Sequence, residues 1–195
     1  FLSGTWNPTG SSPEFGIWAL IIGTLKITVI ATIVAVPIGL GAAIYLNEYA
    51  SDRSRRIIKP ILEILAGIPT IVFGFFALTF VTPILRNLIP NLGEFNSISP
   101  GIVVGIMIVP MITSMSEDAM SSVPDKIREG AFGLGATKFE VATKVVLPAA
   151  TSGVVASIVL GISRAIGETM IVSLAAGSSP TSSLSLTSSI QTMTG

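Results

Sequence analysis

The sequence predicts an all-α membrane protein, a polytopic bundle of helices that cross a lipid bilayer. Of its 195 residues, 50% are hydrophobic and only 11% are charged, whereas about 25% are charged in a soluble domain. The mean hydropathy of +0.80 means that the apolar side chains exceed what one compact core would shield from water. Four uncharged segments are each long enough, or nearly so, for a spanning helix of about 20 residues. Lipid is therefore expected to be part of the solvent.

The four spans form one expected transmembrane domain over residues 1–195, preceded by a polar segment (1–16) and followed by a Ser/Thr-rich segment (177–195). The chain starts at Phe1 without the basic start of a signal peptide, and it ends without a helix cap. We therefore expect a fragment, truncated at both ends. Allowing for helix ends, the spans are predicted at residues 17–46, 61–82, 101–117 and 149–176.

Basic residues indicate how the chain is oriented in the membrane. Lys and Arg crowd the cytoplasmic side of membrane proteins. The segment between the second and third spans contains only Arg86. We therefore predict that 51–60 and 117–148 are cytoplasmic and that both ends of the chain lie outside. The eight basic residues of the two inner segments are Arg53, Arg55, Arg56, Lys59, Lys126, Arg128, Lys138 and Lys144.

Small residues predict where these helices approach one another closely. Gly101 and Gly105 open the third span, and a stripe of small residues follows the fourth. Lys26 and Glu63 lie near span ends, where long side chains extend to the interface, so neither is assigned a function. The stripe consists of Gly153, Ser157, Gly161, Ala165 and Thr169.

The composition also excludes several classes of function. The sequence has no Cys and no His, which excludes disulfides, zinc fingers and catalysis by a thiol or an imidazole; we expect no cofactor and no metal site. The 11 basic residues balance 11 acidic ones, so nucleic acid is not an expected partner. Gly130 and Gly135 match half of a phosphate-binding P-loop, but Ala136-Thr137 replaces its Lys-Ser/Thr pair, so no nucleotide site is predicted.

The inner segment 117–148 is too patterned to be a simple connection. One short helix is predicted from about Pro124 to Phe132. A second begins at Thr137, where Thr137 and Glu140 match a T-x-x-E capping box, and Gly133 and Gly135 supply the turn between the two. A cytoplasmic helix pair with an apolar face predicts a protein partner. The apolar face of the second helix consists of Phe139, Ala142, Val145 and Val146.

This segment resembles the EAA loop of ABC importer permeases, written EAA-x3-G-x9-I-x-LP. Glu129-Gly130-Ala131, Gly135 and Val145-x-Leu147-Pro148 match it at every spacing, with Gly130 and Val145 as conservative departures. The resemblance implies a type I importer permease with the MetI-like fold and no ATPase site of its own. It also implies that Glu129, Gly130, Ala131, Gly135, Leu147 and Pro148 belong to a coupling helix that docks on an ATP-binding subunit.

Three further segments narrow the resemblance to the phosphate permeases of the PstC and PstA families. They are GLGAAIYLNEYA (39–50), LAGIPTIVFGFFAL (65–78) and SRAIGETMIV (163–172), and RAIGETM with the following AAGSSP and IQTMTG is more similar to PstC. The resemblance implies multi-pass insertion in a prokaryotic inner membrane and phosphate import by alternating access. It implies as partners a second, PstA-like permease, a PstB-like ATP-binding dimer and a PstS-like phosphate-binding protein.

Arg164 and Glu168 are the charged residues placed most deeply in a predicted span. An arginine at that depth costs at least about 2.5 kcal/mol and is by default a functional candidate. Glu168 lies one turn later on the same face, so the two can neutralise each other. The resemblance implies a role in phosphate passage, to which Ser163 and Thr169 would add hydroxyl groups. The alternative is a structural ion pair that ties the fourth span to a neighbour.

Two other functions remain open at this point. The EAA loop is shared by permeases for molybdate, sulfate, methionine and other solutes, so the cargo depends on the weaker phosphate-permease segments. A channel or carrier that works without ATP belongs to a different class. It would need charged or polar residues in several spans, and only Arg164 and Glu168 are convincingly placed.

Overall fold

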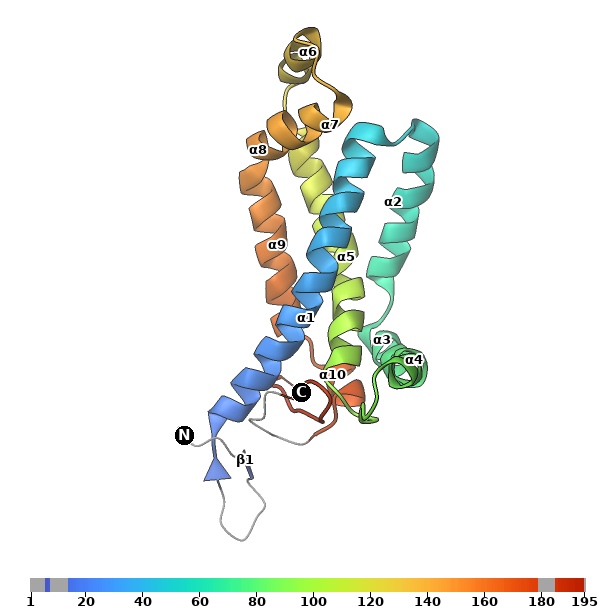
Figure 1. Ribbon diagram of the computed structural model, residues 1–195, viewed down its shortest axis with the longest axis vertical. Helices are drawn as coiled ribbons and strands as arrows, with labels where there is room; N and C mark the ends of the chain where they lie inside the picture. The colour runs from blue at the N-terminus through green and yellow to red at the C-terminus, as the bar shows by residue number, and fades with distance from the viewer. Residues whose placement is uncertain (1–5, 8–13, 179–184, 195) are drawn as a thin grey trace. The chain divides into compact units, whose positions relative to one another are not determined.

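The computed structural model describes residues 6–7, 14–178 and 185–194, and this part is largely helical (Figure 1). The short strands β1 (Trp6–Asn7) and β2 (Glu14–Phe15) pair antiparallel before the first helix. The polar segment 1–16 and the Ser/Thr-rich segment 177–195 lie partly outside the described residues. The helical elements are α1 (Ile17–Ile44), η1 (π-helical, Tyr45–Tyr49), α2 (Asp52–Gly67), α3 (Thr70–Phe76), η2 (π-helical, Ala77–Val81), α4 (Thr82–Leu88), α5 (Ile98–Ser121), α6 (Asp125–Gly133), α7 (Lys138–Glu140), η3 (π-helical, Val141–Val146), α8 (Leu147–Ala149), α9 (Thr151–Ile166) and α10 (Met170–Ala175).

Three continuous helical stretches of the described chain are long and apolar enough to span a membrane. They are Ile17–Tyr49, Thr70–Leu88 and Ile98–Ser121. A fourth candidate is the pair Lys138–Ala149 and Thr151–Ile166, which is bent by 75°. The predicted fold class, an all-α membrane bundle, is confirmed. The bounds of the second and fourth predicted spans need correction.

The second span lies further along the chain than predicted. Residues 61–82 are not one helix, because α2 ends at Gly67 and α3 begins at Thr70. Pro69 explains the break, since a proline disfavours helical backbone in the residue before it, here Ile68. Among the residues of α2 none is buried, and the helix carries all four basic residues of segment 51–60. The apolar span therefore starts after the proline.

The fourth predicted span, 149–176, is also interrupted. Helix α9 ends at Ile166 and α10 starts at Met170. Gly167, a poor helix former, begins the break. The carboxylate of Glu168 then accepts hydrogen bonds from the amides of Met170 and Ile171, at 3.2 and 3.3 Å. These contacts begin a new helix, so we call residues 167–169 the helix break.

The chain folds into two compact units, and the first consists of residues 1–34, 68–107 and 162–195. In this unit Gly101 faces Ile30 of α1, where an added Cβ would lie 2.7 Å from the isoleucine side chain. A Cβ on Gly105 would lie 2.9 Å from Val34. The predicted close approach of these two glycines to a neighbouring helix is therefore confirmed. Gly74 of α3 packs in the same way against Ile171 of α10.

The second unit consists of residues 35–67 and 108–161. Here the small residues of α9 pack against α5: Gly153 faces Ala119, and the hydroxyls of Ser157 and Ser116 lie 2.7 Å apart. A Cβ on Gly161 would lie 2.9 Å from Ile112. This part of the predicted stripe is confirmed, whereas Thr169 lies beyond the end of the helix. Figure 1 shows α6 at one tip of this unit.

Candidate functional site

The loop between α5 and α9 folds as the predicted helix pair. Helix α6 starts after Pro124, and α7 starts after Thr137, whose hydroxyl accepts from the Glu140 amide at 3.3 Å. The Glu140 carboxylate accepts in return from the Thr137 amide at 3.1 Å, which completes the capping box. Gly135 joins the two helices with φ +87°, a conformation that favours glycine. We call residues 125–146 the α6–α7 hairpin.

The charge of Glu140 is stabilised by its place at the start of α7. The hydrogen bond from the Thr137 amide, followed by that from Lys144, holds the pKa of Glu140 below its ordinary value. The Lys144 ammonium lies 3.2 Å from Oε1 of this carboxylate. The negative charge complements the positive end of the helix. The capping box and the ion pair therefore stabilise the start of α7.

The outer surface of the hairpin is unusually apolar for an exposed loop. Leu134 is 91% exposed and Phe139 67% exposed. Ile127 and Phe132 are exposed as well. Four large apolar side chains exposed on one loop favour a contact with another protein over contact with water alone.

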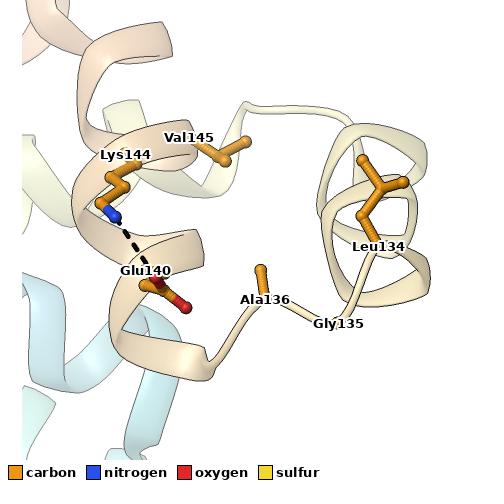
Figure 2. Close-up of a pocket in the computed structure, with 6 residues that line it drawn as sticks. All are labelled: Leu134, Gly135, Ala136, Glu140, Lys144 and Val145. Atoms are coloured by element: carbon orange, nitrogen blue, oxygen red, sulfur yellow. Dashed lines mark hydrogen bonds and ion pairs between the residues drawn. The ribbon is translucent and has the colours of Figure 1, made fainter.

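An open groove of about 330 Å³ lies between the two arms of the hairpin (Figure 2). Leu134, Gly135 and Ala136 of the turn form one side, and the Glu140–Lys144 pair and Val145 form the other. One side of the groove is therefore uncharged, and the other carries the ion pair between Glu140 and Lys144. Such a surface suits a protruding side chain of another polypeptide better than a small charged ligand, because its acid and base neutralise each other.

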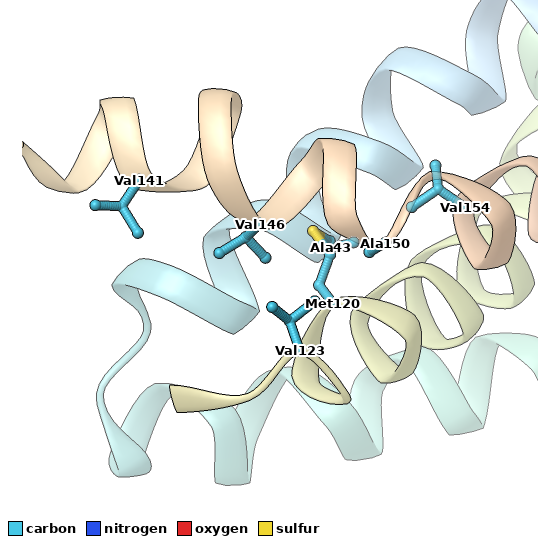
Figure 3. Close-up of a cluster of buried hydrophobic side chains, with 7 residues drawn as sticks. All are labelled: Ala43, Met120, Val123, Val141, Val146, Ala150 and Val154. Atoms are coloured by element: carbon cyan, nitrogen blue, oxygen red, sulfur yellow. The ribbon is translucent and has the colours of Figure 1, made fainter. Parts of the chain in front are cut away.

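The base of the hairpin is anchored in a buried apolar cluster (Figure 3). Ala131, Ala136 and Leu147 pack against this cluster. The predicted coupling residues divide into two groups. Ala131 and Leu147 are half-buried against the cluster, whereas Glu129, Gly130, Gly135 and Pro148 are exposed. These contacts join the hairpin to residues of α1, α5 and α9. The cluster consists of Ala43, Met120, Val123, Val141, Val146, Ala150 and Val154.

The structure places the predicted substrate-path residues in one short stretch of the first unit, around the helix break. Arg164 and Ser163 lie in the last turn of α9 and are exposed, and Thr169 is exposed just before α10. Glu168 is only 8% exposed. Within the described chain no ion pair joins Arg164 to Glu168. The expected mutual neutralisation fails because the helix ends at Ile166, so the carboxylate turns to the backbone of α10 instead.

Two contacts made by charged side chains were not predicted from the sequence. Lys26 is 8% exposed, and its Nζ donates to the Ser185 carbonyl at 3.0 Å. Arg128 forms an ion pair of 2.8 Å with Glu48. The two partners are 80 positions apart, so no local pattern could have paired them.

Comparison with known proteins identifies the family to which the chain belongs. Residues 35–195 match the model of the binding-protein-dependent transport system inner membrane component. This chain belongs to that family. The match includes the α6–α7 hairpin and the helix break.

Two curated relatives are similar to most of this chain. A probable ABC transporter permease protein, YqgH of Bacillus subtilis, is 39% identical over 88% of this chain and 56% of its own length. The phosphate transport system permease protein PstC of Haemophilus influenzae is 37% identical over 89% of this chain and 61% of its own length. The chain thus spans about three fifths of these relatives.

A solved structure supports the fold assignment. The MetNI methionine ABC transporter, crystallised in inward-facing conformations, matches with a TM-score of 0.63 at 22% identity, over 74% of this chain and 67% of that one. At this identity the likeness concerns the fold alone. The chain therefore has the fold of a type I ABC importer permease, as the EAA-like loop predicted.

Proposed function

We propose that this chain is a membrane-spanning permease subunit of an ATP-driven importer of inorganic phosphate. The observation that carries the proposal is its similarity to PstC over 89% of the chain at 37% identity. The α6–α7 hairpin, with its apolar exposed face, supports the ATP-driven mechanism. The subunit itself has no ATPase site in this proposal and moves phosphate by alternating access.

The proposed assembly has three kinds of partner besides lipid. A second, PstA-like permease completes the transmembrane pathway, and a PstB-like ATP-binding dimer docks on the hairpin face around Glu129 and Gly130. A PstS-like binding protein delivers phosphate from outside. In a prokaryotic inner membrane this places 51–60 and 117–148 in the cytoplasm and both ends of the chain outside, in agreement with the distribution of Lys and Arg.

Arg164 is the proposed contact for phosphate. Its guanidinium is always charged and offers several donors to a tetrahedral oxyanion. It is exposed and has no ion-pair partner within the described chain, so it is available to an anion. Ser163 and Thr169 lie on either side of it and offer hydroxyl groups. Glu168 acts here by holding α10 and the helix break in place.

The cargo is tested by competition for uptake. Proteoliposomes that contain the chain with its partner permease, ATP-binding subunits and binding protein should accumulate radiolabelled phosphate when ATP is supplied. Unlabelled phosphate should compete, whereas molybdate, sulfate and methionine should not. Uptake of one of those solutes in place of phosphate would contradict the proposed cargo, although the chain would still be a subunit of an importer.

A further inference from the structure

Arg128 of α6 makes a buried contact that ties the hairpin to the end of the first helix. Its Nη1 donates to Oε1 of Glu48 at 2.8 Å, and its Nη2 donates to the Met120 carbonyl at 2.6 Å. The side chain of Arg128 is 14% exposed and that of Glu48 is 6% exposed. One guanidinium thus joins α6, η1 and the last turn of α5, all within the second unit.

The segment η1 is held from a second direction as well. Arg55 of α2 donates through Nε to the Leu46 carbonyl at 2.8 Å and through Nη2 to the Asn47 carbonyl at 2.9 Å. These carbonyls belong to the end of a helix, where backbone acceptors lack intrahelical partners. Two arginines from different segments therefore fix the position of η1. Among the hydrogen bonds and ion pairs of the described residues, the link from η1 to the hairpin is the one made by Arg128.

The contact is better suited to transmitting movement than to stabilising the fold. A buried ion pair must offset the loss of hydration of both charges, so it often contributes no more to stability than an apolar pair of the same shape, although it fixes geometry. Within the described chain, Arg128 Nε and Asn47 Oδ1 are buried without a hydrogen-bond partner. A junction selected for stability alone is expected to satisfy such atoms.

We propose that Arg128 is a positioning residue for coupling: through Glu48 it makes the hairpin and the end of α1 move as one body. This inference rests on the proposed ATP-driven function. Arg128 directly precedes Glu129 at the exposed face that the ATP-binding subunit is proposed to grip. A displacement of that face therefore reaches η1 through the guanidinium, in addition to reaching the core through Ala131.

The test removes the link without leaving a lone buried charge. The variant Glu48→Gln/Arg128→Met is compared with the charge swap Glu48→Arg/Arg128→Glu in the full transporter. A matched control, Lys59→Met/Glu117→Gln, removes a 2.9 Å ion pair of the same unit that does not include α6. Two quantities are measured: solute taken up per ATP hydrolysed, and hydrogen exchange of α6 and η1 with and without ATP and vanadate.

We expect the neutral variant to assemble and hydrolyse ATP while uptake per ATP falls about tenfold. The charge swap should recover most of that loss, and the control should equal the wild type. ATP and vanadate should change exchange in both α6 and η1 of the wild type, but only in α6 of the neutral variant.

The proposal is overturned if the neutral variant keeps the wild-type ratio of uptake to hydrolysis, or if its α6 and η1 still respond together. Failure to assemble with the ATP-binding subunits would also overturn it, because Arg128 would then be merely structural. Failure of the proposed cargo is distinguishable, since the exchange measurement requires no phosphate.

Discussion

Gly130 and Gly135 lie in the same hairpin but differ in what their backbones require. Gly130 is inside α6, and an added Cβ would meet no atom within 4 Å, so Gly130→Ala should stabilise the protein by about 0.5–1 kcal/mol. Gly135 has φ +87°, so Gly135→Ala should destabilise it by about 1–2 kcal/mol. Thermal unfolding of the purified variants in detergent measures both effects.

The pair is its own control, because both changes add one methyl group to an exposed backbone. Gly130→Ala should also leave ATP-driven uptake intact, since alanine stands at this position in the EAA pattern. Equal shifts in the same direction for the two variants would contradict the assigned conformations.

Arg164 is the residue whose removal should separate transport from folding. Because its side chain is exposed at the end of α9, Arg164→Ala should fold normally while phosphate uptake falls about tenfold or more. Arg164→Lys should recover only part of the uptake, since an ammonium lacks the planar set of donors. Radiolabelled uptake by equal amounts of assembled transporter measures this, and normal uptake by Arg164→Ala would exclude the passage role.

At the scale of the element, the capping box determines how firmly α7 is held. Thr137→Ala removes the hydroxyl that accepts a hydrogen bond from the Glu140 amide, and we expect the loss to cost about 1 kcal/mol. Hydrogen exchange of the α7 amides should accelerate accordingly. Thr143→Ala is the matched control, because its hydroxyl donates to the Phe139 carbonyl at 2.7 Å and does not cap the helix. A larger effect at Thr143 would contradict the cap assignment.

The same element should respond to acid. The folded-state pKa of Glu140 lies below its ordinary value of 4.5, so its contribution to stability is complete above that value and is lost as pH falls through the lower folded pKa. Exchange protection of α7 in the wild type should therefore weaken on acidification. Glu140→Gln should lack that pH dependence; if it shows the same dependence, another group is responsible.

The sequence predicted the elements that depend on local signals and missed those that depend on distant contacts. The hairpin was predictable, because Pro124, Thr137 and Gly135 mark its ends and its turn within a few residues. The second span was predicted too early in the chain, because the residues on both sides of Pro69 are apolar and the hydropathy pattern does not show the break at that proline. The helix break at Glu168 was not predicted. It depends on the Glu168 carboxylate, which accepts hydrogen bonds from the amides of Met170 and Ile171 and so starts a new helix.

For the whole molecule, the hydropathy pattern and the EAA-like loop were sufficient to predict both the fold class and the family. They were not sufficient to predict the Glu48–Arg128 contact, since the packing of the second unit alone brings these residues together. The same limit applies to Lys26, whose burial depends on the chain near Ser185.

The central claim is that this subunit moves its solute only when an ATP-binding partner acts on the α6–α7 hairpin. The most direct test compares proteoliposomes containing both permeases and the binding protein, with and without the ATP-binding subunits, at matched protein content. We predict that phosphate accumulates only when the ATP-binding subunits and ATP are both present. Accumulation or steady conduction of phosphate without those subunits would contradict the account.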